Sequence, residues 1–595
     1  MQNNDRSTVA NPSAETLALS SPQPPDQPQP LTNPHRRKFL GQMGQMSAAL
    51  AVGSLAAPQL AAAEAKPQVT GNPGGNARAA EAFAVRLAAA TAEATIPIPS
   101  HQTNGDAQRY PDGSANYTKC VLQDGIDRVN PNAYALYLKA AASGSPEDWA
   151  NVPMGGTRTL NGPQGAYAYT LVGTDAQQLG SSPSLANQEP EVVVPAPPPI
   201  ASAQAGTEMI EHYWGALLRD TAFIDYPTSP LAAAACAELT AQPTYTGPRN
   251  QYGQVTPNLL FRGGNPGETI GPYMSQLITT PTTFGALPLP MQFITYLPGI
   301  NYMMDPFTYQ QVQNGISTGL LDQPDPTPRY LHNGRGLGGY THVDVLYEAF
   351  FLAYLTLSSL NVPLNPGNPY VVGSFNQNGF GTFGGPDFAA SVADVSVRAL
   401  NATWFQKWVV HNRNRPEVGG ALVYLAKTGQ SNSVQARVNQ NLLNSQAVKQ
   451  TYETFDTWFL PQAFPEGSPA HPAYPTGHGT VAGACITVLK FFYDGAYVIP
   501  NPTQPSDDGL SLLPYTGADA GQITVNGELN KLAHNISFGH GIHAGIHWRS
   551  DTDISIQVGE AFAISYLQDK ARTYNEKFTI NITKIDGTIA TISNQ

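Results

Sequence analysis

The stretch HVDVLYEAFFLAYLTLSSL, residues 342–360, is apolar almost all round a helical wheel, and it constrains the fold more than any other segment. A helix without a polar face has to be covered on every side, so it belongs inside a packed bundle. Further helices are expected at 388–412, 475–495, 526–551 and 553–576. The sequence therefore predicts a mainly α fold with a helical-bundle core.

The remainder of the chain is richer in turns and short helices. Gly 55 and Pro 52 in a chain of 595 residues exceed the roughly 12% that these two residues contribute on average. Because 27 Tyr and 22 Phe are too many for a chain that cannot pack, we expect long ordered loops. The segment 190–204 reads as an extended Pro-rich connector, and shorter helices are expected at 77–94, 132–143 and 206–226.

The C-terminal segment KFTINITKIDGTIATIS alternates apolar and polar residues about Asp586-Gly587, which predicts a small β-hairpin at 577–595. We divide the rest into an N-terminal helical and loop region at 66–335 and a helical core at 336–576. Residues 1–65 form a separate leader, since residues 1–34 are polar and Pro-rich.

Residues 36–65 resemble a twin-arginine export signal. Arg36, Arg37 and Lys38 precede a weakly apolar run, and Ala61, Ala63 and Ala65 suit a cleavage site. A transmembrane anchor is the alternative, but the run is short and contains glycine. We expect a periplasmic or extracellular protein with no membrane span in its mature form.

Charge and cysteine content exclude some functions. The 31 basic and 43 acidic residues give a formal net charge of −12, which argues against a nucleic-acid partner. Cys120, Cys236 and Cys485 allow one disulfide at most, so the chain is not held together by a disulfide framework.

Three segments carry chemically interesting residues. The first is KWVVHNRNRPE, in which Lys407 and Arg415 lie near the end of a largely apolar helix. On its own, this charge is also explained by a solvated helix end.

The second segment is PAYPTGHGT, directly before an apolar helix. The turn at Pro475 and Gly477 would leave backbone N–H groups of the helix start free, which is the arrangement of an anion site. Thr476 adds a hydroxyl and His478 an acid/base group. A plain capping turn is the alternative.

The third segment is HGIHAGIHWRSD. If the helix is continuous, His540, His543 and His547 lie on one face, with Asp551 one turn beyond His547. A zinc site and ordinary core histidines are the alternatives.

Together these segments resemble the vanadium-dependent haloperoxidases, in particular the bromoperoxidases of red algae and cyanobacteria. That family shares its anion site with the type-2 phosphatidic acid phosphatases and bacterial acid phosphatases. The resemblance covers about residues 330–575, and the seven residues between Lys407 and Arg415 suit the haloperoxidases, whereas the phosphatases usually have one fewer.

The resemblance implies a role for each matching residue. His547 would coordinate vanadium, and His478 would be the acid/base group. The oxygens of vanadate would be bound by Lys407, Arg415, Thr476 and the N–H of Gly477. His471 matches a position that influences halide handling.

Two positions depart from the family pattern. Thr476 replaces the usual serine and keeps the hydroxyl. Gly541 stands six residues before His547, where the family has a second arginine. With one extra residue in the alignment, His540 takes that place as a weaker, pH-dependent donor. The alternative is that the anion site lacks one cation.

The implied function is a vanadate-dependent peroxidase that oxidises bromide or iodide with hydrogen peroxide and halogenates small organic acceptors. The alternatives are an acid phosphatase with His547 as nucleophile and an inactive exported homologue. The resemblance also implies a homo-oligomer.

The loop 374–387, with Asn376, Asn378 and Asp387, offers oxygens for Ca²⁺, although a plain turn-rich loop explains it as well.

Overall fold

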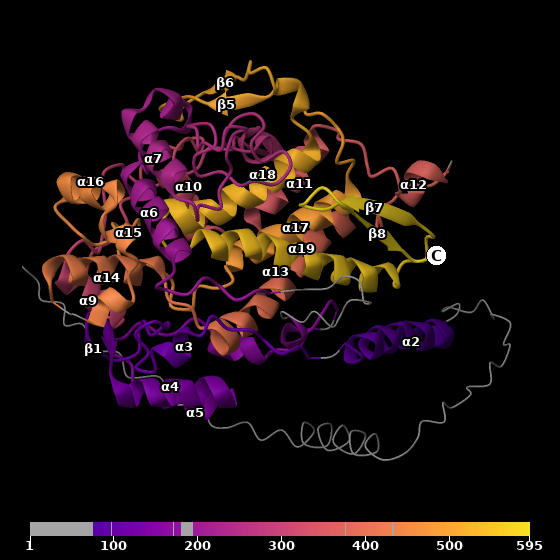
Figure 1. The fold of residues 1–595 in the computed structure, drawn as a ribbon. Coiled ribbons are helices and arrows are strands. Elements are labelled where there is room, and N and C mark those ends of the chain that lie inside the picture. Colours follow the sequence, from indigo (N-terminus) through magenta and orange to yellow (C-terminus); the bar gives the residue numbers. More distant parts are fainter. Residues whose placement is uncertain (1–74, 97, 171, 180–193, 375, 431–432) are drawn as a thin grey trace, which may run out of the picture. The chain divides into compact units, whose positions relative to one another are not determined.

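The computed structural model describes residues 75–96, 98–170, 172–179, 194–374, 376–430 and 433–595. Residues 76–595 group into one unit by their contacts, and the elements of this unit are drawn in Figure 1. The expected export signal and the leader before it lie outside the described residues. Within the described part of the chain, no helix combines the length and the apolar character needed to cross a membrane.

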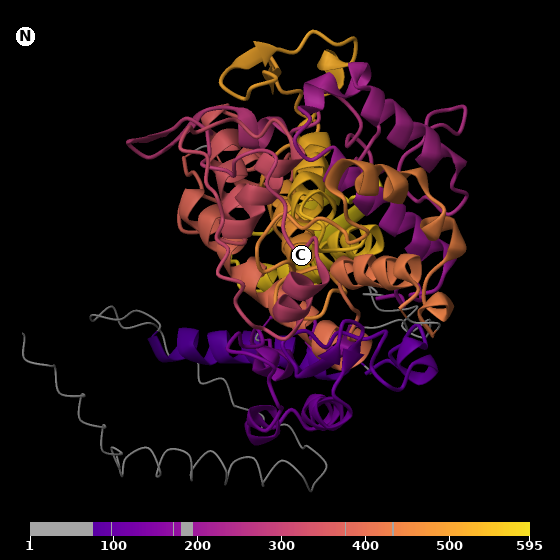
Figure 2. The ribbon, with the colours of Figure 1, turned by 90° about the vertical axis from the view of Figure 1, so that its left-hand side faces the viewer.

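The core is a bundle of long helices, as the sequence predicts. It consists of α13 (Gly385–Phe405), α17 (Gly477–Phe492), α18 (Val525–Phe538) and α19 (Arg549–Ala571), which pack against one another. Figure 2 shows α18 and α19, in yellow, running through the middle of the unit. Every residue of α17 is buried, so the run that follows the Thr476 turn is the most enclosed helix of this bundle.

Two glycines allow α17 and α19 to touch backbone to backbone. A Cβ on Gly483 would lie 2.0 Å from the carbonyl oxygen of Ile556, and a Cβ on Gly559 would lie 2.0 Å from that of Thr480. Since real Cβ atoms do not approach so closely, only glycine fits at either position. This contact fixes α19, and with it Asp551 and Ser555, beside the first turn of α17.

The other helices surround the core. Those before it are α2 (Gly75–Ala94), α3 (Asp106–Arg109), α4 (Pro131–Ser143), α5 (Pro146–Ala150), α6 (Ala203–Leu217), α7 (Pro230–Ala241), α8 (Gln276–Thr279), α9 (Pro306–Gln313), α10 (Gly334–Val343), α11 (Glu348–Ser359) and α12 (Pro369–Val372). Between α13 and α17 lie α14 (Pro416–Thr428), α15 (Gln440–Leu443) and α16 (Gln446–Phe455). Short 3₁₀ turns are η1 (Pro163–Tyr167), η2 (Ala176–Gln178), η4 (Phe223–Thr228), η6 (Ser433–Ala436) and η7 (Ala520–Gln522).

Two short π-helical segments interrupt the pattern of the long helices. They are η5 (Gln406–His411), which follows α13, and η8 (Gly539–His543), which follows α18. A π-helix takes up an extra residue in one turn and often marks a functional site. Both segments carry residues of the candidate site.

The strands of the described residues form antiparallel pairs at the surface. They are β1 (Gln123–Gly125) with β2 (Arg128–Val129), β3 (Thr282–Phe284) with β4 (Leu287–Leu289), β5 (Thr503–Pro505) with β6 (Leu512–Pro514), and β7 (Thr579–Thr583) with β8 (Ile589–Ser593). In the last pair Thr579 faces Ser593 and Thr583 faces Ile589, which confirms the predicted C-terminal hairpin.

Some predicted helix boundaries were wrong. The helix expected at 342–360 is divided into α10 and α11, with Asp344 in the break. The helix expected at 206–226 ends at Leu217, and a 3₁₀ turn follows. The helix expected at 526–551 ends with η8, so His547 lies in the turn before α19. The apolar pattern on all sides of 342–360 does not indicate where that helix begins or stops, which explains the first of these differences.

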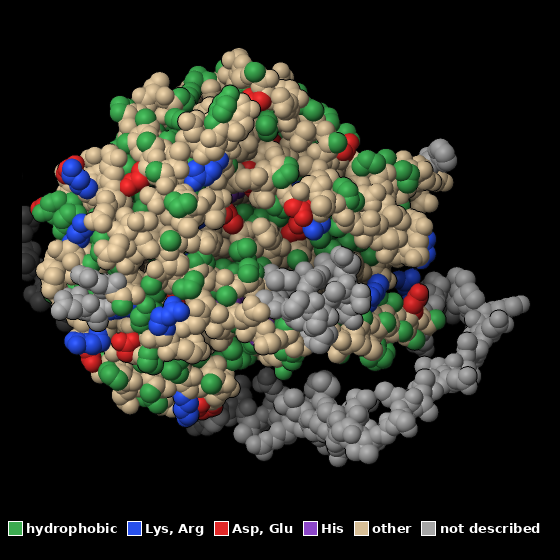
Figure 3. Space-filling model, viewed as in Figure 1, with side chains coloured by type: hydrophobic (Ala, Val, Ile, Leu, Met, Phe, Trp, Pro, Cys, Tyr) green, Lys and Arg blue, Asp and Glu red, His purple; other side chains and the backbone are tan. Residues whose placement is uncertain are grey.

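Low charge is visible on the surface as well. Figure 3 shows acidic and basic side chains as scattered spots on one face of the molecule. The three cysteines are buried and free. The division of the chain into 66–335 and 336–576 stays a prediction.

Candidate functional site

The first turn of α17 presents unpaired polar groups in a buried place. Thr476 is the N-cap residue, but its side chain caps no N–H group of the helix. Its Oγ1 is buried without a hydrogen-bond partner among the described residues, and its N–H donates to Ser555 Oγ over 2.7 Å. Because the N–H groups of Gly477, His478 and Gly479 precede the first intrahelical bond, from Thr480 N to Thr476 O, the turn is suited to an anion.

Gly479 keeps this turn closely packed. A Cβ there would lie 2.7 Å from Ser555 Cβ and 2.8 Å from Ser537 Oγ. Any larger side chain would therefore push α19 away from the first turn of α17.

Lys407 and Arg415 bring two buried positive charges to the loop before α17. Lys407, in η5, donates from Nζ to the carbonyl oxygens of Pro472 (2.9 Å) and Ala473 (2.8 Å). Arg415 donates from Nε (3.0 Å) and Nη2 (2.8 Å) to the carbonyl oxygen of His471. Neither side chain forms an ion pair with a carboxylate in the described part of the chain. Buried charges without partners are costly, so this site favours an anionic ligand.

The pKa shifts agree with this charge imbalance. Burial lowers the pKa of the Lys407 ammonium well below 10.5, and the nearby Arg415 guanidinium lowers it further. Burial also lowers the pKa of Arg415 to about 10. A bound anion would stabilise both positive charges.

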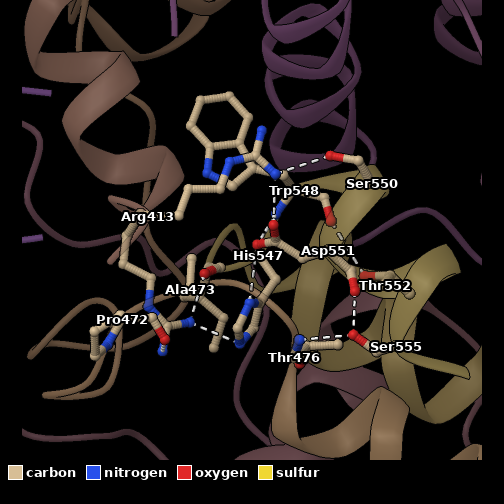
Figure 4. A network of polar contacts seen from close by, with 12 residues as sticks. Arg413, Pro472, Ala473, Thr476, His547, Trp548, Ser550, Asp551, Thr552 and Ser555 are labelled. Atoms are coloured by element: carbon tan, nitrogen blue, oxygen red, sulfur yellow. Dashed lines mark hydrogen bonds and ion pairs between the residues drawn. The ribbon is translucent and has the colours of Figure 1, made fainter. Parts of the chain in front are cut away.

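His547 is oriented by a chain of polar contacts, which Figure 4 shows. Its Nδ1 lies 3.2 Å from Asp551 Oδ2, and Asp551 Oδ1 lies 2.5 Å from Arg413 Nη1. An N–H donated from Nδ1 to the carboxylate leaves the lone pair on Nε2, which accepts from Arg415 Nη1 at 2.7 Å. Burial lowers the pKa of His547 well below 6.5, so the ring is neutral, as metal coordination by histidine requires.

His478 lies next in α17 and pairs with Asp344 in the break between α10 and α11. His478 Nε2 is 3.0 Å from Asp344 Oδ1. The break in the predicted helix therefore places this carboxylate in the site. Since Nε2 is engaged, Nδ1 is the nitrogen that remains for proton exchange with a ligand.

His540 also lies in the site. Its ring stacks on that of His478 with a centroid distance of 3.8 Å, and it lies 5.5 Å from that of His547. His540 belongs to the π-helical turn η8, which holds one residue more than an α-helical turn. Its Nδ1 is buried and has no partner among the described residues. Burial lowers the pKa of His540 well below 6.5, so it is a neutral donor near pH 7.

His471 lies on the Arg415 side of the site. Its Nδ1 is 3.0 Å from Arg415 Nη2, and its ring centroid is 4.7 Å from that of Trp404. Burial lowers the pKa of His471 well below 6.5. The ring and the indole thus form an uncharged wall beside the buried cations.

The prediction that His540, His543 and His547 share one helical face was wrong. His543 turns away and lies 2.8 Å from Tyr273 Oη, inside an aromatic cluster. These histidines therefore do not converge on one metal ion, which argues against the zinc alternative. In the described residues, three potential metal ligands come together at Asp322, His342 and Glu466 instead.

The loop 374–387 does not leave Asp387 free for calcium. Asp387 is buried, its Oδ1 pairs with Lys570 at 2.6 Å, and its Oδ2 accepts from Tyr574 Oη at 2.7 Å. The calcium prediction stays untested, but the lysine already neutralises this carboxylate.

Two residues of the site were missed by sequence reasoning. Asp344 lies in the first turn of the apolar helix expected at 342–360, where an acidic residue is itself a signal. Arg413, between Lys407 and Arg415 in the sequence motif and the last arginine but one in it, holds Asp551, a role that the motif does not indicate. Arg549, the other arginine near His547 in sequence, instead pairs with Glu211 in the core, with Nε 2.8 Å from Oε2.

The site thus joins two buried cations, a free helix start, an uncharged histidine held by a carboxylate and a second histidine–aspartate pair. A helical bundle with this site defines a class of proteins that bind a phosphate-like oxyanion in contact with histidine.

Comparisons with known proteins identify the family within this class. The chain is 30% identical over 534 residues to a vanadium-dependent bromoperoxidase of Ascophyllum nodosum, covering 86% of this chain and 92% of the relative. It is 28% identical over 600 residues to the vanadium-dependent bromoperoxidase of Corallina officinalis, covering 86% of this chain and 98% of the relative. The chain belongs to the vanadium haloperoxidase family.

The fold agrees with this assignment. The structure of a second vanadate-dependent bromoperoxidase of Ascophyllum nodosum, described as homohexameric, superposes with a TM-score of 0.80 at 26% identity, covering 92% of this chain and 95% of the other. A scan against protein-family profiles gives no match.

Proposed function

We propose that this protein is a vanadate-dependent peroxidase that oxidises bromide and iodide with hydrogen peroxide. The observation that carries the proposal is the pair of buried cations, Lys407 and Arg415, which lack carboxylate partners among the described residues and lie beside the neutral ring of His547. The names of the relatives, which are bromoperoxidases, support the same reaction. The product, a hypohalous-acid equivalent, would halogenate small organic acceptors.

The side chains present fit vanadate. Its negative charge would be balanced by Lys407 and Arg415, and its oxygens would accept hydrogen bonds from the unpaired Thr476 hydroxyl and the N–H of Gly477. His547 Nε2 would be the protein ligand of vanadium, because Asp551 fixes the tautomer that leaves this lone pair available. When bound, vanadate would activate hydrogen peroxide as a Lewis acid, and the vanadium would keep its oxidation state.

The remaining residues handle protons and halide. Hydrogen peroxide, bromide and one proton give hypobromous acid and water, so each turnover consumes a proton. His478 would exchange it at Nδ1, while Asp344 holds the ring through Nε2. His540 would add a further hydrogen bond to the anion, and His471, beside Trp404, would contact the halide.

The test is bromide-dependent bromination of a phenolic dye by peroxide, with protein that has been depleted of vanadate and then reloaded. We expect activity that requires both vanadate and bromide and is absent from His547→Ala. Vanadate-independent bromination, or none after stoichiometric loading of folded protein, would contradict the proposal.

An acid phosphatase is the second candidate, because the same lone pair on His547 Nε2 faces a cation-rich anion site and His478 could protonate a leaving group. Hydrolysis of a phosphate monoester by vanadate-free protein distinguishes the two. An inactive exported homologue would show neither activity while remaining folded.

We also propose that the chain forms a homo-oligomer and is exported. A homohexameric structural neighbour supports the first point, and the twin-arginine-like segment at 36–65 supports the second. Light scattering of the purified protein and N-terminal sequencing of protein from a periplasmic fraction test them.

A further inference from the structure

A second cavity lies apart from the oxyanion site. It has a volume of about 170 Å³ and lies between η4, the loop 257–274 and strand β5. An apolar cavity of about 150 Å³ is large enough to hold benzene. The size therefore suits one aromatic ring with a small substituent.

Aromatic side chains form much of the wall. Phe223 and Tyr273 stack on each other at a centroid distance of 3.7 Å, and Tyr226 and Tyr515 also line the cavity. Rings of this kind favour a flat, apolar ligand body through offset or edge contacts.

Arg262 gives the cavity a positive charge without a direct counterion. Its side chain is buried at 6% exposure and donates only to backbone carbonyl oxygens, from Nη1 to Glu268 (3.2 Å) and from Nη2 to Gly271 (3.0 Å). Its Nε has no hydrogen-bond partner and its guanidinium no ion pair among the described residues. A buried guanidinium in this state can donate hydrogen bonds to a carboxylate and balance its charge.

The acidic groups nearby are already engaged. Asp519 lines the same cavity, but its Oδ2 accepts from the Gly271 N–H at 2.7 Å and its Oδ1 from Tyr515 Oη at 2.6 Å. Glu528, farther from the cavity, pairs with Lys531. Asp519 thus reduces the positive potential of the cavity without contacting Arg262.

We propose that this cavity binds a small aromatic carboxylate, with the carboxylate on Arg262 and the ring against Phe223 and Tyr273. Tyr273, in the wall of the cavity, is also connected to the oxyanion site through His543. Tyr273 Oη donates to the Phe261 carbonyl (2.8 Å) and so accepts Nε2–H of His543, which belongs to the same π-helical turn as His540. The proposal does not depend on the peroxidase function.

The experiment measures binding of benzoate to the full-length, vanadate-free protein by calorimetry or ligand-observed NMR. Benzyl alcohol, which lacks the charge, and cyclohexanecarboxylate, which lacks the aromatic ring, are the comparison probes. We expect benzoate to bind more tightly than either.

Two variants should act in opposite directions. Arg262→Gln removes a charged hydrogen bond and should weaken benzoate binding about ten- to a hundred-fold. Asp519→Asn removes the repelling charge and should tighten it by several-fold. Arg128→Gln, at an exposed arginine on β2, is the matched control and should change nothing.

Equal affinities for benzoate and benzyl alcohol, or an Asp519→Asn protein that binds benzoate no more tightly than wild type, would overturn the proposal. These two measurements decide the question even if Arg262→Gln fails to fold. Thermal unfolding of each variant shows whether it has folded.

Discussion

Replacing His540 by arginine should strengthen vanadate binding. The sequence predicts that His540 takes the place of the family's second arginine, and its ring stacks on His478 and lies 5.5 Å from the ring of His547. Burial keeps the pKa of His540 well below 6.5, so at pH 7 the site lacks the charge that arginine would supply. A guanidinium also stacks well on an aromatic ring such as His478.

The size of the effect follows from the geometry. An anion bound at His547 would lie near its ring, so the 5.5 Å between the His540 and His547 rings approximates the distance from an arginine at position 540 to the anion. Two opposite unit charges at this distance attract each other by about 3 kcal/mol at an effective dielectric constant of 20. One charged hydrogen bond contributes about 1.5–3 kcal/mol. Both figures correspond to a gain in affinity of about ten- to a hundred-fold. A third buried cation would repel Lys407 and Arg415 when no anion is bound, so the free protein should be less stable.

The dependence on pH has a definite sign. An anion raises the depressed pKa of His540, so binding takes up a proton and affinity falls as pH rises. Arginine stays charged, so His540→Arg should reduce this dependence, and the advantage should be larger at pH 8 than at pH 5.5. His540→Gln, a neutral donor that does not titrate, should also flatten the profile but without the gain.

The assay is the dissociation constant of vanadate for the three proteins at both pH values. Ionisation of vanadate itself affects the three proteins equally, so the difference between variants reports on the residue at position 540. Identical constants for wild type and His540→Arg at both pH values would refute the reasoning and remove His540 from the anion site.

Three further substitutions test the site. His547→Ala should abolish vanadate retention while the protein stays folded, as shown by equilibrium dialysis and circular dichroism; full retention would mean that another residue is the ligand. His478→Ala should lower kcat by about 10²–10⁴-fold with little change in vanadate affinity, and near-normal bromide oxidation at neutral pH would exclude the acid/base role. Gly479→Ala would place a Cβ 2.7 Å from Ser555 Cβ, so it should lower the free energy of unfolding by about 1–3 kcal/mol and weaken vanadate binding; an unchanged Tm would show that α19 can move aside.

Much of the site followed from sequence because its residues sit in short motifs. Lys407, Arg415, Thr476, His478 and His547 converge as the motifs imply. In each case, a local turn or helix start sets the position of the side chain, and such turns leave a clear trace in the sequence.

The position of Asp344 and the π-helical segments η5 and η8 could not be predicted, because each depends on where a helix is interrupted or gains one residue in a turn. The apolar residues that follow Asp344 do not show where their helix begins, so its position between α10 and α11 was not foreseen. Likewise, η5 and η8 differ from α-helix only in the hydrogen-bond partner of a few N–H groups. Periodicity alone therefore does not show which way His540 faces, whereas in the structure its ring stacks on that of His478.

Buried ion pairs between distant segments have a consequence for how the protein folds. Lys119 pairs with Glu417 at 2.7 Å, and Arg549 pairs with Glu211 in the core. Lys119 Nζ also holds the carbonyl oxygens of Glu466 and Ser468, just before His471. Contacts between residues so far apart in the chain form slowly, since long loops must close first. Although the site motifs all lie in the last third of the chain, the nascent C-terminal part should therefore acquire a working site only after it docks on the segments synthesised first.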